Sequence, residues 1–167
     1  ERIGRAKRPG SPRALVVSPT RELAQQIDAA CTQLAKASNR RMLTVMGGTK
    51  YKGQIAKLDR GIDVLVATPG RLYDLMERGV VKLGDVEVLV LDEADRMLDM
   101  GFVRDVTRIL DLMPKRKNLG MFSATISREV MDISWVYQRD PVEITVRADQ
   151  ENKPDILQYR LEVERNR

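Results

Sequence analysis

Short apolar runs alternate along the chain with stretches in which apolar residues recur every three or four positions. The runs are rich in valine, leucine and isoleucine, and they predict buried strands at residues 14–17, 42–46, 63–67, 86–91, 118–122 and 142–146. The helical spacing between them predicts helices at about residues 23–34, 49–58, 68–76, 102–113 and 127–137. Strands that alternate with helices predict an α/β domain with a mainly parallel sheet and helices on both faces.

Composition narrows the class of protein without choosing a function. The chain has 167 residues, of which 43% are hydrophobic and 32% are charged, as in an ordinary soluble domain. It has no histidine and one cysteine, which excludes histidine-based catalysis, most zinc sites and an internal disulfide. No apolar stretch approaches the length of a membrane span, and no signal-peptide pattern opens the chain. We therefore expect a cytoplasmic protein with no membrane partner.

The net charge of +5 is concentrated at the beginning of the chain. Residues 1–13 hold five basic residues and one acid, so four of the five excess charges lie there. The glycines, prolines and serine in this stretch predict a flexible basic lead-in loop. Residues 14–147 then form the domain, and residues 148–167 are expected to be a polar interdomain linker followed by a further strand that starts a second domain. Because the excess charge lies in the lead-in, any case for nucleic-acid binding depends on specific positions elsewhere.

Five of the predicted strands end in unusual polar or glycine-containing loops: Ser18 to Glu22, Gly47-Gly48, Thr68 to Arg71, Asp92 to Asp95, and Ser123 to Thr125. In a parallel sheet, the carboxyl ends of the strands share one edge, where ligands collect. Free N–H groups at helix starts bind anions, and Arg21 and Arg71 add positive charge beside two of them. Three anion sites along one edge suit the phosphates of a nucleic-acid backbone. Taken singly, each loop also has a structural explanation as a helix cap or a turn.

Adjacent carboxylates at Asp92 and Glu93 follow the predicted strand at residues 86–91. Packing gives no reason for two acids at the end of a buried strand, although a solvated turn would tolerate them. In a nucleotide-hydrolysing site, one carboxylate holds Mg²⁺, usually through water, and the next orients or deprotonates the attacking water. The loops together favour such a site.

These segments resemble the DEAD-box family of ATP-dependent RNA helicases, in the first of their two RecA-like domains. The matching segments are PTRELAQQ at residues 19–26, GG at 47–48, TPGR at 68–71, LDEAD at 91–95 and SAT at 123–125. Their order and spacing fit the family from about residue 14 to residue 146. The resemblance implies a RecA-like P-loop NTPase fold, with ATP and Mg²⁺ as cofactors and with RNA and a second RecA-like domain as partners.

The resemblance also implies a role for each matching residue. The residues that would contact the RNA sugar-phosphate backbone are Pro19, Thr20, Arg21, Gly47, Gly48, Thr68, Pro69, Gly70 and Arg71. Asp92 would hold Mg²⁺ and Glu93 would activate water, and the two would form the cofactor site. Asp95 would connect to Ser123 and Thr125, which couple hydrolysis to strand separation.

The phosphate-binding pattern G-x-x-x-x-G-K-[ST] is absent from the 167 residues. The resemblance implies that this loop, with the first strand and an adenine-sensing glutamine segment, precedes the chain. We therefore expect part of a helicase that, alone, neither hydrolyses ATP nor unwinds RNA. We also expect the absent strand to leave a gap, or exposed strand edges, beside the acid-bearing strand, unless rearrangement or a partner chain fills it. A non-catalytic RNA- or protein-binding module and a DNA-directed relative are the alternative interpretations.

Overall fold

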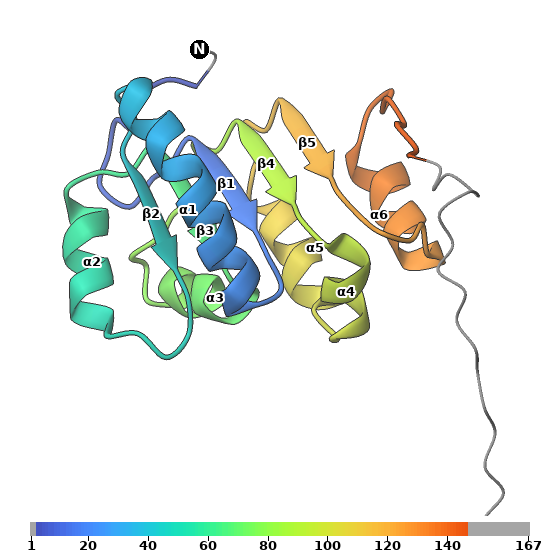
Figure 1. Cartoon of the computed structure of the whole chain (residues 1–167), viewed down its shortest axis with the longest axis horizontal. Helices are drawn as coiled ribbons and strands as arrows, with labels where there is room; N and C mark the ends of the chain where they lie inside the picture. The colour runs from blue at the N-terminus through green and yellow to red at the C-terminus, as the bar shows by residue number, and fades with distance from the viewer. Residues whose placement is uncertain (1–2, 147–167) are drawn as a thin grey trace, which may run out of the picture.

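The computed structural model describes residues 3–146, which form one parallel sheet with flanking helices (Figure 1). The strands are β1 (Ala14–Val17), β2 (Met42–Val45), β3 (Val64–Ala67), β4 (Val88–Leu91) and β5 (Asn118–Met121). The helices are α1 (Arg21–Ala37), α2 (Tyr51–Asp59), α3 (Pro69–Glu77), α4 (Ala94–Asp99), α5 (Val103–Asp111) and α6 (Arg128–Tyr137). None of the helices in this part of the chain is long and apolar enough to cross a membrane.

The sheet has the strand order β2-β3-β1-β4-β5, and every pairing is parallel. Helix α1 lies in front of the sheet in Figure 1, whereas α3 and α5 lie behind it and contact each other. The predicted α/β fold, with a parallel sheet and helices on both faces, is therefore confirmed. Because all five strands run in one direction, the loops that follow them meet at one edge of the sheet.

The sheet interior is apolar, as the short hydrophobic runs predict. Leu15, Leu65 and Leu89 pair across the three central strands, and each is fully buried. Leucines from α3 and apolar residues from α5 pack on them as one continuous core. A core of this kind fixes the strand register, and the register fixes where each loop begins.

The lead-in loop is packed against the sheet rather than flexible. Gly10 has φ +65° and a backbone N–H that donates to the Leu58 carbonyl, and Ser11 is only 2% exposed. A Cβ at Gly10 would stand 2.0 Å from the Val80 carbonyl oxygen, so only glycine fits there. Residues 3–13 do form a loop without helix or strand, as predicted, but backbone contacts hold it in place where the prediction was a flexible segment.

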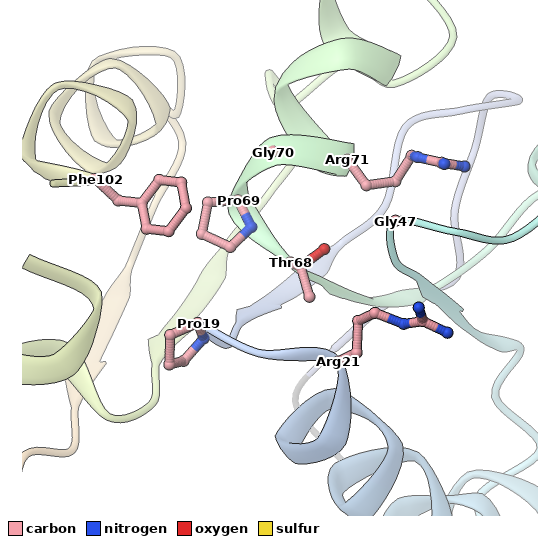
Figure 2. A pocket seen from close by; sticks show the side chains of 8 residues that line it. All are labelled: Pro19, Arg21, Gly47, Thr68, Pro69, Gly70, Arg71 and Phe102. Atoms are coloured by element: carbon pink, nitrogen blue, oxygen red, sulfur yellow. The ribbon is translucent and has the colours of Figure 1, made fainter. Parts of the chain in front are cut away.

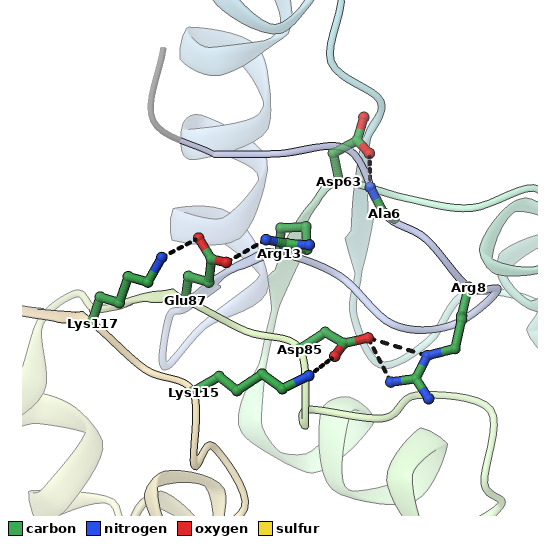
Figure 3. Close-up of polar contacts among 8 residues, drawn as sticks. All are labelled: Ala6, Arg8, Arg13, Asp63, Asp85, Glu87, Lys115 and Lys117. Atoms are coloured by element: carbon green, nitrogen blue, oxygen red, sulfur yellow. Dashed lines mark hydrogen bonds and ion pairs between the residues drawn. The ribbon is translucent and has the colours of Figure 1, made fainter.

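Ion pairs also hold the lead-in at the amino-terminal edge of the sheet (Figure 3). Arg8 and Lys115 both pair with Asp85, and Arg13 and Lys117 both pair with Glu87. The buried Asp63 carboxylate accepts hydrogen bonds from the backbone N–H groups of Ala6 and Arg41, at 2.6 and 2.8 Å. Two of the lead-in's basic side chains are thus neutralised at the edge opposite the strand-end loops.

The expected gap beside the acid-bearing strand does not occur. β4 pairs with β1 on one side and with β5 on the other, through all four of its residues. The prediction was wrong because β5 occupies that position. β5 is therefore an edge strand within the described part of the chain, and it has one unpaired side.

The prediction of a strand at residues 142–146 was also wrong. Its alternating apolar residues, Val142, Ile144 and Val146, are 86%, 85% and 90% exposed, and the segment has no strand structure. An isolated extended segment forms no ladder, and it pairs with none of the five strands described. The predicted linker and following strand at residues 148–167 lie outside the described residues.

Candidate nucleic-acid interface and acidic site

A pocket of about 350 Å³ opens at the carboxyl-terminal edge of the sheet (Figure 2). It is lined by Pro19, Arg21, Gly47, Thr68, Pro69, Gly70, Arg71 and Phe102. Seven of the nine residues predicted to contact a nucleic-acid backbone are in this set, and they come from the loops after β1, β2 and β3. The structure therefore brings three loops that are far apart in sequence to one concave surface.

The first loop and the glycine pair contact each other through Arg21 and Gly48. Thr20 ends the loop as the N-cap of α1, and its Oγ1 accepts a hydrogen bond from the Leu23 N–H at 3.3 Å. Gly48 has φ +77°, and a Cβ there would lie 2.7 Å from Arg21 Nη1. A side chain at this position would be strained and would displace the guanidinium, so Gly48 permits the close contact.

Arg71 is held on the second side of the pocket by the start of α2. Its Nη1 donates to the Thr49 carbonyl at 3.2 Å and to Gln54 Oε1 at 2.9 Å. Its guanidinium lies 4.0 Å from the centre of the Tyr51 ring, a cation–π distance. Burial, with a smaller contribution from the charge of Arg78, lowers the pKa of Arg71. An arginine stays charged under such conditions, so the pocket keeps a fixed positive group.

The backbone at the start of α3 is accessible from the pocket. Thr68 takes the N-cap position and Pro69 lies in the first turn, although Thr68 makes no side-chain hydrogen bond to the helix. A Cβ added at Gly70 or at Gly47 would meet no atom within 4 Å. Both glycines therefore border open space, where a ligand backbone could approach closely.

Phe102 contributes an apolar wall to the pocket that sequence reasoning did not include in the site. Its ring lies beside Pro69 in Figure 2, across the pocket from the two arginines. In the sequence it marks the apolar face of a helix, and it does contact the core. The signal available in the sequence was the glycine before it. Gly101 has φ +88° and turns the chain between α4 and α5, just before Phe102.

The acidic loop after β4 has an unusual backbone. Glu93 has φ +46° and ψ +52°, a left-handed conformation that is uncommon for a residue other than glycine. The Glu93 N–H donates to Asp92 Oδ1 at 3.0 Å, and the Glu93 carboxylate pairs with Arg96 at 3.1 Å. Strain of this kind is concentrated at functional sites, and here it follows directly from the turn that places both carboxylates at the strand end.

A metal at this loop would be held mostly by water. Within residues 3–146, no three acidic, histidine or cysteine side chains are close enough to form a metal cage. Mg²⁺ commonly binds through one or two carboxylates and several waters, so the donor chemistry of Asp92 fits that ion. No phosphate-cradling loop is present in the sequence to hold a nucleotide beside it.

Asp95 joins the acidic loop to the loop after β5. Its Oδ2 accepts hydrogen bonds from the Thr125 N–H at 2.9 Å and from the Thr125 hydroxyl at 2.8 Å. The Asp95 N–H donates to Ser123 Oγ at 3.1 Å, and the Ser123 hydroxyl donates to the Thr125 carbonyl. Burial alone would raise the pKa of Asp95, but these bonds and one from the Arg96 N–H lower it overall. The three residues are thus in contact, as the resemblance to the helicase family implies.

The family model described as DEAD/DEAH box helicase matches residues 1–133. The chain belongs to this helicase family. It is 41% identical over 148 residues to an ATP-dependent RNA helicase RhlB from Shewanella amazonensis, covering 87% of this chain and 34% of the relative. It is 46% identical over 136 residues to the ATP-dependent RNA helicase DBP2 from Candida albicans, covering 81% of this chain and 24% of the relative. The chain thus spans about a third or less of these helicases.

Solved helicase structures have the same fold. One is a hypothetical ATP-dependent RNA helicase from Sulfolobus tokodaii, with a TM-score of 0.74 and 40% identity, matched over 77% of this chain and 39% of that chain. Another is the yeast DEAD-box splicing factor Prp28, with a TM-score of 0.72 and 37% identity, matched over 77% of this chain and 31% of that chain. The RecA-like assignment of the fold is therefore confirmed for this helicase domain.

Proposed function

We propose that this chain forms the RNA-facing part of an ATP-dependent RNA helicase and binds the sugar-phosphate backbone of single-stranded RNA. The observation that carries the proposal is the pocket shared by the three loops after β1, β2 and β3. It combines two guanidinium groups, helix starts and two glycines that border open space. Such groups bind phosphates without reading bases. The relatives are named as ATP-dependent RNA helicases, and this supports RNA as the ligand.

In the proposed mechanism, the acidic loop serves ATP hydrolysis. Asp92 would hold Mg²⁺ through its water shell, and the ion would supply positive charge to the nucleotide phosphates. Glu93 would orient the attacking water; the left-handed turn sets where its side chain begins, and its carboxylate pairs with Arg96. Asp95, Ser123 and Thr125 would transmit the state of the acidic loop to the segment after β5, through the hydrogen bonds that already join them.

The nucleotide site is incomplete in this sequence. Asp92 and Glu93 can place a metal and a water, but no loop with a lysine is present to hold the phosphates. We therefore expect no ATPase activity above background from the 167-residue chain, with or without RNA. A rate that exceeds background and disappears in Glu93→Gln would contradict this expectation. In the intact helicase, a second RecA-like domain would complete both sites.

The proposed RNA site is tested by binding of a short single-stranded RNA over a series of salt concentrations. Arg21→Ala and Arg71→Ala should each weaken binding, and each should lower the salt slope by about 0.7 because one phosphate contact is lost. Lys36→Ala is the matched control, since Lys36 lies in the last turn of α1, roughly 22 Å along the helix from Arg21. RNA affinity that is unchanged in both arginine variants would contradict the proposed site.

Binding through the lead-in needs a separate control. Deleting residues 1–13 would remove the contacts of Gly10 and the ion pairs of Arg8 and Arg13, and it would disturb the fold. The exposed Arg5 and Lys7 are better replaced by alanine, because their loss leaves those contacts intact. RNA binding lost in that variant, and unchanged in Arg21→Ala, would assign the affinity to the lead-in.

The second candidate function is a non-catalytic RNA- or protein-binding module. The absent phosphate loop favours it for this chain in isolation. Retention of RNA without ATP turnover would agree with it. A DNA-directed activity is distinguished by matched RNA and DNA strands, since contacts to the 2′-hydroxyl favour RNA.

A further inference from the structure

Gln54 is a buried polar residue on α2, and it is only 7% exposed. A buried amide needs partners at both of its polar ends. Its Nε2 donates to Thr49 Oγ1, and its Oε1 accepts from Arg71 Nη1 at 2.9 Å. Because a guanidinium only donates, the amide oxygen must face Arg71, and this fixes the orientation of the whole amide.

The hydrogen bonds continue on both sides of Gln54. The Thr49 hydroxyl donates to the Met46 carbonyl at 2.8 Å, where β2 gives way to the glycine pair. Arg71 Nη1 also donates to the Thr49 carbonyl at 3.2 Å. One amide therefore connects the loop that holds Gly47 and Gly48 with the first turn of α3.

The same contacts fix the plane of the Arg71 guanidinium. Nη1 is held at its edge by Gln54 and Thr49, and the face of the group lies on the Tyr51 ring. Within residues 3–146, Nη2 and Nε of Arg71 donate no hydrogen bond to a protein acceptor. An arginine oriented in this way has donors available to a phosphate and loses little rotational freedom on binding.

We propose that Gln54 is a positioning residue for RNA binding, which acts by orienting Arg71 and by tying the glycine loop to the start of α3. This inference rests on the proposed function, since it assumes that Arg71 contacts the RNA backbone. A purely structural role would make Gln54 important for folding only. The two roles differ in whether the effect of Gln54 on RNA binding depends on Arg71.

A double-mutant cycle separates these roles. Gln54→Met keeps the length of the side chain and removes both polar ends. We expect it to weaken binding of single-stranded RNA by roughly 3- to 10-fold, and by less than about 2-fold in an Arg71→Ala background. Gln33→Met is the matched control, because Gln33 is exposed on α1, and it should bind RNA as the wild type does. Melting curves should show that both single variants are folded.

Thr49→Val is a second variant in case Gln54→Met does not fold. It removes the hydroxyl that anchors the Gln54 amide and keeps the shape of the side chain, so the same dependence on Arg71 is expected. Unchanged binding, or an equal loss in both backgrounds, would overturn the positioning role. If the wild type shows no Arg71-dependent binding at all, the proposed RNA site itself fails, and that outcome is visible in the Arg71→Ala arm alone.

Discussion

The Asp95 carboxylate and Thr125 are joined by two hydrogen bonds that converge on one carboxylate oxygen, at 2.8 and 2.9 Å. This contact spans two neighbouring strand ends, because Asp95 follows β4 and Thr125 follows β5. It also holds the carboxylate in its charged form, since the donors lower the pKa of Asp95. The acidic loop and the loop after β5 are therefore expected to move together.

We expect Asp95→Asn and Thr125→Val each to destabilise the domain by about 1 kcal/mol, because the first removes the charge of the acceptor and the second removes the hydroxyl donor. The double variant should cost less than the sum of the two, since the residues share their bonds. Urea unfolding of the four proteins measures this coupling. Asp99→Asn is the control, because Asp99 is exposed at the end of α4. Additive losses would show that the contact does not couple the loops.

A second prediction concerns acid stability at the opposite edge of the sheet. Hydrogen bonds from Lys115 and Arg8 lower the pKa of Asp85 from 3.8 to about 2. Because the folded-state pKa lies below the unfolded one, the stabilisation is present above about pH 4 and is lost as the pH falls towards 2. Both partners are 64% exposed, so solvent screening reduces the contribution to about 1 kcal/mol.

Asp85→Asn should therefore lower the free energy of unfolding at pH 7 by about that amount, and the difference from wild type should vanish near pH 2. Urea unfolding at several pH values measures both quantities. Asp132→Asn provides the comparison, since Asp132 is exposed on α6. A loss that persists unchanged at pH 2 would mean that packing, rather than the ion pairs, is responsible.

The strands and their loops could be predicted because their signals are local. Each apolar run that pairs with another strand forms part of the sheet. The polar residues that follow it lie at the carboxyl-terminal edge of the sheet. The segment at residues 142–146 carries the same pattern but failed, since strand structure needs a pairing partner that the pattern cannot supply. The short helix α4 was missed because its six residues follow the acids without a long apolar repeat.

The contacts that orient the side chains of the pocket could not be predicted from the sequence. Gln54 looks like any polar residue of an amphipathic helix, and only the fold reveals that its amide is buried between Thr49 and Arg71. The lead-in looks flexible from its composition. Its order depends on Asp85 and Glu87, which are more than seventy positions away. Contacts at such separations leave no local pattern.

A third prediction separates a structural glycine from a ligand-facing one. Gly70 lies in the first turn of α3, and a Cβ there would meet no atom within 4 Å. Gly70→Ala should therefore keep the stability of the domain or raise it by up to about 1 kcal/mol. If an RNA backbone approaches Gly70 closely, the added methyl group should still weaken RNA binding several-fold.

Thermal melting and RNA titration of the same Gly70→Ala preparation test both halves of this prediction. Gly79→Ala serves as a contrast, because Gly79 has φ +68° beyond the end of α3. That change should lower stability, since alanine is strained in this conformation. RNA affinity that is unchanged in Gly70→Ala would show that no ligand approaches the start of α3.

The last prediction concerns the apolar wall of the pocket. Phe102 faces the same cavity as the two arginines, so a bound strand would place its phosphates towards Arg21 and Arg71 and its ribose and base surfaces towards the ring. Phe102→Leu keeps an apolar side chain on the core, and because Phe102 is only partly buried it should cost clearly less than the roughly 3–5 kcal/mol of a Phe→Ala change in a core. It should weaken RNA binding, because stacking on an aromatic ring contributes roughly 1 kcal/mol or more.

The salt dependence distinguishes this loss from the loss of an arginine. Phe102→Leu removes no charge, so the slope of affinity against salt concentration should equal that of the wild type, whereas Arg71→Ala should reduce it. Fluorescence anisotropy of a labelled single-stranded RNA measures both the affinity and the slope. A reduced slope in Phe102→Leu would mean that the substitution had shifted the arginines, and full affinity would remove Phe102 from the RNA-binding surface.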